Sequence, residues 1–121
     1  RYAGRDPSDI DVIELPDMSS WHYFAYLDCI LGLEPGEAEK MLRKGDIDPI
    51  RGKIPVCPSG GTNAFGEAVV AQGLAQVCEL VWQLREEAGD RQVKKDRLKV
   101  ALVQTYGYAG NNAACILSRA W

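Results

Sequence analysis

The sequence predicts an α/β fold: a layered mixed sheet that is covered by helices. Short segments rich in β-branched residues alternate with segments of helical character, which is typical of such layered folds. The last two extended segments are separated by a turn rich in glycine and asparagine, which predicts an antiparallel hairpin. The 121 residues suffice for one compact domain with a hydrophobic core, and we take residues 1–121 as that domain.

The chain begins with short elements. Residues 6–9, Asp-Pro-Ser-Asp, predict a turn or the start of a helix. Residues 10–15 are rich in isoleucine and valine and predict a strand, which Pro16 and Asp17 end.

Two helices are expected next. The serines at positions 19 and 20 can cap a helix over residues 21–31, whose apolar residues crowd one side. A second helix is expected over residues 37–44, between Gly36 and Gly45.

The middle of the chain contains the longest predicted helix. Residues 46–53 predict a surface loop and residues 54–57 a short extended piece. The helix is expected to begin at Phe65 or Glu67 and to run to about Ala88, mostly buried. Its apolar residues recur at helical spacing at Val69, Leu74, Val77, Leu80, Val81 and Leu84, with Ala71 and Gly73 as small contact positions.

The chain ends in the predicted hairpin. Residues 99–105 and 113–119 are expected to pair as antiparallel strands, joined by a turn over residues 106–112.

Composition excludes several classes of function. The net charge is −3 and no basic run contains interleaved aromatic residues, so we expect no nucleic-acid partner. No apolar stretch approaches the roughly 20 residues that span a bilayer, and no signal peptide is visible. Because the chain begins with Arg1 rather than methionine, we expect a fragment, a processed product or one piece of a longer protein.

The cysteines are widely spaced, form no C-x-x-C pair, and are accompanied by a single histidine, His22. We therefore expect no metal site. Each cysteine sits in or beside an apolar segment, which favours buried, reduced thiols and a cytoplasmic protein. The cysteines are Cys29, Cys57, Cys78 and Cys115.

Residues 58–76, PSGGTNAFGEAVVAQGLAQ, resemble the loop and following helix of the thiolase superfamily, and within it the sterol-carrier, or non-specific lipid-transfer, thiolases. That family reads roughly NPSGG, then GHP, then G-x-x-G-L-A-Q. Here Glu67 replaces the histidine and Ala68 replaces the proline. The glycines and the loop length match while the reactive residue differs, which indicates altered or lost chemistry.

The resemblance extends over essentially the whole chain. Residues 9–15, residues 83–93 and the final hairpin are also similar to sterol-carrier-type thiolases, which carry a QLRGEAG-x-RQV run. The resemblance implies that this chain is the C-terminal half of a thiolase. In that family the two halves pack together and bury a pair of long helices between their sheets. A solitary half would expose the apolar side of its helix, so we expect association with an N-terminal half, on the same or a separate chain, and a dimer of thiolase units.

Thiolases make and break carbon–carbon bonds beside a coenzyme A thioester. The resemblance implies that thioester as substrate and no tightly bound cofactor. The nucleophilic cysteine belongs to the N-terminal half, so this chain alone should lack the acyl-cysteine step. In the first of three contributed loops, relatives carry Asn-Glu-Ala-Phe or His-Asp-x-Phe, whereas this chain has Pro16 and Asp17. Asp17 matches the acid, and we favour for it a turn carboxylate that caps the helix beginning at Trp21.

The second loop contains Glu67. The family histidine donates to the thioester oxygen, whereas an ionised carboxylate can only accept. Glu67 could act as a base, or it could be a first-turn carboxylate that the helix dipole stabilises. The expected substrate- or coenzyme-A-binding glycines are Gly60, Gly61 and Gly66 here, and Gly107 and Gly110 in the hairpin turn.

The third loop is the hairpin turn, where thiolases read Cys-x-Gly-x-Gly and the cysteine is the second acid/base. Counting back from the final strand puts Tyr106 on that cysteine. A phenol can donate to a carbonyl or alkoxide oxygen but is a poor base at neutral pH. Tyr106 therefore favours the thiolase-like aldolases of steroid side-chain degradation, which use tyrosines to cleave a β-hydroxyacyl-CoA. The alternative for Tyr106, and the favoured one for Tyr108, is an aromatic residue that packs a core or a subunit contact.

Two further expectations concern turn and aromatic residues. Gly107, Gly110 and the two asparagines should form a tight turn that lets backbone amides approach a ligand. Residues 21–24, Trp-His-Tyr-Phe, could line an apolar acyl or sterol pocket, but core packing explains them better. For His22 we expect a partly exposed position on the helix.

Two functions remain open. The first is part of a thiolase-like aldolase or lyase that cleaves an acyl-CoA with a bulky, sterol-like side chain, with Tyr106, Glu67, Tyr108 and Asp17 as catalytic candidates. Such aldolases resemble subunits that pair with a small protein containing a zinc ribbon and an OB-fold. The second is a non-catalytic, degenerate module that binds lipid or a CoA ester, or supports an active partner. An ordinary thiolase is disfavoured because the histidine and cysteine are gone.

Overall fold

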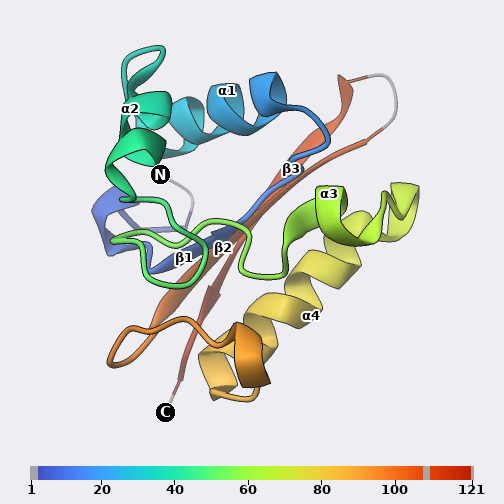
Figure 1. Ribbon diagram of the computed structural model, residues 1–121. Helices are drawn as coiled ribbons and strands as arrows, with labels where there is room; N and C mark the ends of the chain where they lie inside the picture. The colour runs from blue at the N-terminus through green and yellow to red at the C-terminus, as the bar shows by residue number, and fades with distance from the viewer. Residues whose placement is uncertain (1–2, 108–109, 121) are drawn as a thin grey trace.

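The computed structural model describes residues 3–107 and 110–120 as a mixed sheet with helices against both faces (Figure 1). Its strands are β1 (Val12–Glu14), β2 (Val100–Tyr106) and β3 (Asn112–Ser118), in that order across the sheet. β1 and β2 are parallel, whereas β2 and β3 are antiparallel. The predicted mixed sheet and closing hairpin are therefore confirmed.

The predicted extended piece at residues 54–57 lies along the free side of β1. Val56 pairs with Ile13 as an isolated parallel bridge. The N–H of Cys57 donates to the Ile13 carbonyl at 2.8 Å, and the N–H of Ile13 donates to the Pro55 carbonyl at 3.0 Å. This pairing brings the glycine-rich segment to the carboxyl end of β1.

The helices α1 (Ser20–Leu31) and α2 (Glu37–Lys44) cover one face of the sheet (Figure 1), after a short 3₁₀ turn, η1 (Pro7–Asp9). Ser19 caps α1 by accepting the backbone N–H of His22, as the serine pair predicted. A hydrophobic core fills the space between these helices and the sheet. Its buried members are Ile10, Ile13, Leu15, Leu27, Ala38, Ile47, Val56, Cys57 and Leu102.

The other face packs against α4 (Gln72–Arg85), which follows α3 (Gly61–Phe65) and the 3₁₀ turn η2 (Val69–Ala71). A last 3₁₀ turn, η3 (Gly89–Arg91), leads back to β2. Strand residues that point to this face alternate with those that point to α1, as the pleat of a strand requires. The buried residues of this second core are Val12, Leu80, Leu84, Val93, Leu98, Ala101 and Val103.

The single long helix predicted from Phe65 or Glu67 to Ala88 is wrong. Gly66 ends α3 with φ 90°, Val69 has φ 48°, and α4 runs only from Gln72 to Arg85. Right-handed helices require negative φ, so the chain cannot continue one helix through these two positions.

The predicted burial of this helix is also wrong in part. Leu80 and Leu84 are buried, but Leu74 is 67% exposed and Trp82 is 45% exposed. The side of α4 that packs inward is instead mainly polar, with Gln72, Gln76, Glu79 and Gln83 buried. The apolar side of α4 thus faces outward in this chain.

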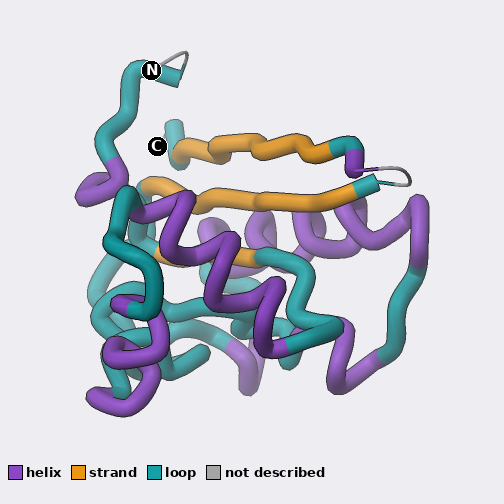
Figure 2. Tube along the Cα trace, turned by 90° about the horizontal axis from the view of Figure 1, so that it is seen from above, coloured by secondary structure: helices purple, strands orange, loops and turns teal. Residues whose placement is uncertain are grey.

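That outward side of α4 continues onto β3, which runs along the outer edge of the sheet (Figure 2). Leu74, Cys78 and Trp82 share one side of α4 because they are spaced by four residues. A hollow between α4 and β3 is lined in part by Leu74 and by Ala113, Ala114 and Cys115. We call these six residues the outer apolar face: Leu74, Cys78, Trp82, Ala113, Ala114 and Cys115.

The prediction of buried cysteines holds only for Cys57. Cys29, Cys78 and Cys115 are exposed, and all four are free thiols. The three exposed cysteines lie on the outward sides of α1, α4 and β3. Apolar residues next to a cysteine in the sequence therefore did not predict its burial. In the described part of the chain, every helix is too short or too polar to traverse a lipid bilayer.

Glu14, the last residue of β1, is a buried carboxyl group. It is 1% exposed and accepts hydrogen bonds from the N–H of Ser59 at 2.9 Å and from the Ser59 hydroxyl at 3.1 Å. Burial raises the pKa of Glu14 from 4.5 to about 7, against the opposing effect of the Ser59 hydrogen bonds. The cost of burying the charge outweighs the hydrogen bonds from Ser59, so the folded chain is most stable when Glu14 is uncharged.

This raised pKa predicts a loss of stability with increasing pH. Between the unfolded pKa of 4.5 and the folded pKa of about 7, the folded chain keeps a proton that the unfolded chain has lost. The stability that this proton provides is fully present below pH 4.5 and is lost as the pH rises through about 7, a change of about 3 kcal/mol. Glu14→Gln stays uncharged, so urea unfolding between pH 5 and pH 8 should show a flatter profile, with Glu34→Gln, an exposed glutamate, as the control. Parallel profiles of wild type and Glu14→Gln would contradict the argument.

Candidate functional site

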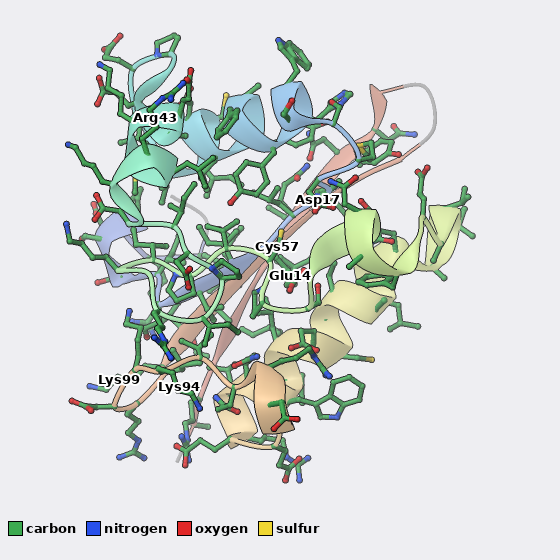
Figure 3. The ribbon with its side chains drawn as sticks, in the orientation of Figure 1. Glu14, Asp17, Arg43, Cys57, Lys94 and Lys99 are labelled. Carbon is green, nitrogen blue, oxygen red and sulfur yellow. The ribbon has the colours of Figure 1, made fainter. Side chains whose placement is uncertain are left out.

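The three loops singled out in the sequence meet at one edge of the sheet. β1 and β2 run parallel, so their carboxyl ends lie at the same edge. The loop after β1, the glycine-rich segment with α3, and the turn after β2 therefore converge there. Figure 3 shows Glu14, Cys57 and Asp17 together where β1 ends, between α1 and the glycine-rich segment.

Asp17 connects the first loop to the second. Its carboxylate accepts the N–H of Thr62 at 2.7 Å, the Thr62 hydroxyl, and the N–H of Asn63 at 3.4 Å. These groups form the first turn of α3, so Asp17 caps α3. The prediction that Asp17 caps the helix beginning at Trp21 is wrong, because Ser19 takes that role.

Gly61 is required because Asp17 lies against it. A Cβ atom at Gly61 would lie 2.0 Å from Oδ2 of Asp17, and the residue has φ +70°. The amides of the glycines in this segment are already used within the chain. Gly60 donates to the Cys57 carbonyl at 3.0 Å, Gly61 to Oγ of Ser59 at 3.0 Å, and Gly66 to the Thr62 carbonyl at 2.8 Å. These three amides are therefore not free to bind a ligand.

Cys57 is a structural thiol. It is buried with φ 56°, a left-handed conformation that is unusual for a residue other than glycine or asparagine, and its thiol donates to the Leu15 carbonyl at 3.3 Å. Burial raises the pKa of the Cys57 thiol, with a further contribution from the Glu14 charge. A thiol that stays protonated is a poor nucleophile, so Cys57 is not a substitute for the cysteine of a thiolase.

Tyr106 and Glu67 meet across the second and third loops. The Tyr106 hydroxyl donates to Oε1 of Glu67, and this hydrogen bond is the main reason that the pKa of Tyr106 is raised. Glu67 lies after the end of α3 and before η2, so the expectation that it sits in the first turn of a helix is wrong. Glu67 is therefore not held by a helix dipole, and its hydrogen-bond partner is the Tyr106 hydroxyl.

A hollow of about 290 Å³ opens beside this pair. Thr105, Tyr106 and Gly107 line one side, and Val69 and Val70 line the other. Val69 combines a β-branched side chain with φ 48°, a conformation that costs energy and is found disproportionately at functional sites. The hollow is mostly apolar, with Glu67 bordering an adjoining recess.

Gly107, Asn111 and Asn112 bring the hairpin turn to this hollow as lining residues. The N–H of Gly107 donates to the Asn111 carbonyl at 2.7 Å, so it is not free to approach a ligand as predicted. Gly110 is exposed with φ +82°, which suits a tight turn. Tyr108, the other tyrosine predicted for the site, lies outside the described residues.

The aromatic residues of α1 divide between core and site. Tyr23 and Phe24 pack against the core, as predicted, whereas Trp21 is 72% exposed. The His22 ring stacks on Tyr106, with centroids 6.4 Å apart and planes 13° apart. The predicted partly exposed position of His22 is confirmed. The sequence did not predict its contact with Tyr106, and the aromatic residues next to it on α1 are the one local pattern that could have indicated it. No cluster of three His, Cys, Asp or Glu side chains suited to a metal ion occurs among residues 3–107 and 110–120.

Residues 1–119 match the family described as thiolase C-terminal domain-like. The chain belongs to this family. It is 39% identical over 114 residues to an acetyl-CoA acetyltransferase of Methanothermobacter thermautotrophicus, covering 94% of this chain and 29% of that protein. It is 45% identical over 109 residues to sterol carrier protein 2 of Bos taurus, covering 89% of this chain and 19% of that protein.

A solved structure of an Ltp2-ChsH2(DUF35) aldolase has the same fold. The TM-score is 0.76 at 23% sequence identity, covering 96% of this chain and 28% of that chain. The thiolase-like fold expected from residues 58–76 and the hairpin is confirmed by this likeness and by the family match. The chain spans less than a third of the length of each of these three proteins.

The contact between Gly61 and Asp17 predicts different costs for two glycine substitutions. Gly32→Ala introduces only backbone strain, because Gly32 has the left-handed φ of 66° and ψ of 35° and no atom lies within 4 Å of a Cβ at this position, and should cost about 1 kcal/mol. Gly61→Ala adds the clash with Asp17 to a similar strain and should cost about 2–4 kcal/mol in urea unfolding. An equal loss of unfolding free energy in Gly61→Ala and in the control variant would show that the Asp17 contact does not constrain the loop.

Proposed function

We propose that this chain is the C-terminal part of a thiolase-like acyl-CoA aldolase or lyase, which cleaves a β-hydroxyacyl-CoA by a retro-aldol reaction. The proposal rests on one observation: the Tyr106 hydroxyl is hydrogen-bonded to the Glu67 carboxylate beside an apolar hollow. These residues come from the two loops where the family resemblance expects cysteine and histidine. A paired phenol and carboxylate supply both a proton donor and a proton acceptor.

The raised pKa of Tyr106 assigns the donor role to the phenol. At neutral pH the phenol stays protonated, because its hydrogen bond to Glu67 disfavours a second negative charge. An ionised Glu67 carboxylate is an acceptor, which suits a general base. The two groups then act as acid and base in one step.

The reaction conserves protons within this pair. Glu67 accepts the proton of the β-hydroxyl group, the bond between Cα and Cβ breaks, and its electron pair moves into the thioester as an enolate. The carbon that carried the hydroxyl becomes a ketone or aldehyde. Tyr106 delivers its proton to Cα, and the proton held by Glu67 returns to Tyr106 through their hydrogen bond. No acyl-cysteine is formed, and no tightly bound cofactor is required.

The other predicted site residues take supporting roles in this proposal. The Asp17 carboxylate is engaged in capping α3, so Asp17 positions the loop that carries Glu67 instead of contacting the reacting atoms. The apolar walls of the hollow support an apolar acyl group as part of the substrate, and the bulky, sterol-like side chain stays a prediction. Participation of Tyr108 stays a prediction.

Loss of the Tyr106 hydroxyl should remove the acid. With the chain assembled with its N-terminal half, Tyr106→Phe should lower kcat for β-hydroxyacyl-CoA cleavage by roughly 100-fold or more. Glu67→Gln keeps a hydrogen-bond acceptor but not a base and should lose a similar factor. Tyr23→Phe, which alters a phenol packed against the core, is the matched control. Near-normal turnover by Tyr106→Phe would remove the aldolase assignment.

The alternative is a non-catalytic module that binds lipid or a CoA ester or supports an active partner. The exposed position of Glu67 favours it, because a general base usually works in a water-excluded site. Binding of a CoA ester without cleavage by the complete wild-type assembly would favour this module over the aldolase.

The partner proposed for the outer apolar face is the N-terminal thiolase half, on the same or a separate chain. Leu74 and Trp82 expose large apolar surfaces, and the chain covers only 29% and 19% of the two curated relatives described above. Assembly into a dimer of thiolase units, and pairing with a subunit that contains a zinc ribbon and an OB-fold, are further parts of the proposal.

Thiol labelling tests whether the N-terminal half covers the outer apolar face. Cys78 and Cys115 lie on the outer apolar face, and Cys29 is exposed on α1 at the opposite face of the sheet. Assembly with the N-terminal half should slow alkylation of Cys78 and Cys115 by at least about 10-fold, read by mass spectrometry, while Cys29 reacts unchanged. Uniform protection, or none, would contradict the assignment of this face.

A further inference from the structure

His22 stands out as a polar side chain that the proton-transfer pair does not use. It lies in the first turn of α1, half-buried, and its ring stacks on the Tyr106 ring with centroids 6.4 Å apart. Tyr106 is separated from it by most of the chain, so the contact exists only in the folded protein. The position puts an imidazole beside the phenol proposed to act as the acid.

Ser19 fixes the orientation of this imidazole. Oγ of Ser19 accepts the backbone N–H of His22 and also lies 2.7 Å from Nδ1 of the ring. Because the serine oxygen already accepts a hydrogen, its own hydrogen is available to Nδ1, which favours the tautomer with the proton on Nε2. Within the described residues, Nε2 has no hydrogen-bond partner, so it remains available to a ligand.

Neighbouring rings hold the imidazole in place. Trp21 meets it edge-on at 5.1 Å, and Tyr26 lies 5.7 Å away at an angle of 34°. The nearly parallel stack on Tyr106, with planes 13° apart, keeps the imidazole beside the phenol. His22 is thus a second possible hydrogen-bond donor next to Tyr106.

The proposed reaction needs such a donor. As the bond between Cα and Cβ breaks, negative charge develops on the thioester oxygen, which fixed hydrogen-bond donors stabilise. Glu67 cannot donate when ionised, and Pro16 in the first loop has no side-chain donor and no N–H. The amides of Gly60, Gly61 and Gly66 are already used.

We infer that His22 binds the thioester oxygen of the substrate, its Nε2–H donating to the enolate oxygen that forms while Glu67 and Tyr106 exchange protons. This inference rests on the proposed aldolase function. It assigns this donor role to the first turn of α1. His22 forms no covalent bond in this role and keeps its proton throughout.

Two amide substitutions separate this role from a structural one. Glutamine places its amide nitrogen near the position of Nε2, whereas asparagine reproduces only Nδ1 and its contact with Ser19. In the assembly with the N-terminal half, His22→Gln should retain kcat within about 10-fold, and His22→Asn should lose roughly 100-fold, with KM changed less than kcat in both. Equal loss in both variants, or better retention in His22→Asn, would overturn the inference in favour of a capping role.

A binding measurement tests His22 without relying on turnover. His22 is the single histidine of this chain, so its ring gives one set of NMR signals when only this chain is labelled. Acetyl-CoA, but not free coenzyme A, should shift the His22 ring signals together with those of Tyr106. A shift of Tyr106 signals without any change at His22 would overturn the inference and leave the proposed function standing. No shift at either residue would overturn both.

Discussion

The carboxylate of Asp17 holds together the part of the molecule on which the site depends. It ties the end of β1 to the first turn of α3, and the missing side chain of Gly61 allows the contact. Glu67 follows α3 directly, so its place opposite Tyr106 is set by this capped turn. A carboxylate at a helix N-terminus satisfies N–H groups that have no partner within the helix. One contact between distant parts of the chain therefore positions Glu67, which lies five residues after Thr62.

The two sides of α4 support the proposed association with an N-terminal half. Glutamine and glutamate side chains of α4 are buried, whereas Leu74 and Trp82 face outward. In an isolated domain the apolar side of a helix normally faces the sheet, and the polar side faces water. An inward side that is mainly polar and an outward side that is apolar are expected of a helix that packs against other elements on both sides. Among the described residues, no other element covers the outer apolar face, whose members are exposed.

The proposed site places its functional side chains differently from a thiolase site, although the fold is the same. A phenol and a carboxylate occupy loops where thiolases are expected to carry cysteine and histidine. The proposed donor is an imidazole from α1, which Ser19 and the rings of Trp21 and Tyr26 hold beside the phenol. Retro-aldol cleavage needs an acid, a base and a donor to an enolate oxygen, and these three side chains can provide them without a covalent intermediate.

The sequence by itself determined the elements whose signals are local: the serine cap of α1, the glycine ends of α1 and α2, the hairpin, and the family to which residues 58–76 point. It also identified Tyr106 and Glu67 as a pair of interest, since motif spacing is written in the chain. Only the tertiary structure decided that Asp17 caps α3, that the predicted long helix breaks at Gly66 and Val69, and that His22 stacks on Tyr106. The physical reason is the same in each case: a cap, a positive φ and a ring contact depend on atoms brought together by folding from distant parts of the chain, which no local pattern records.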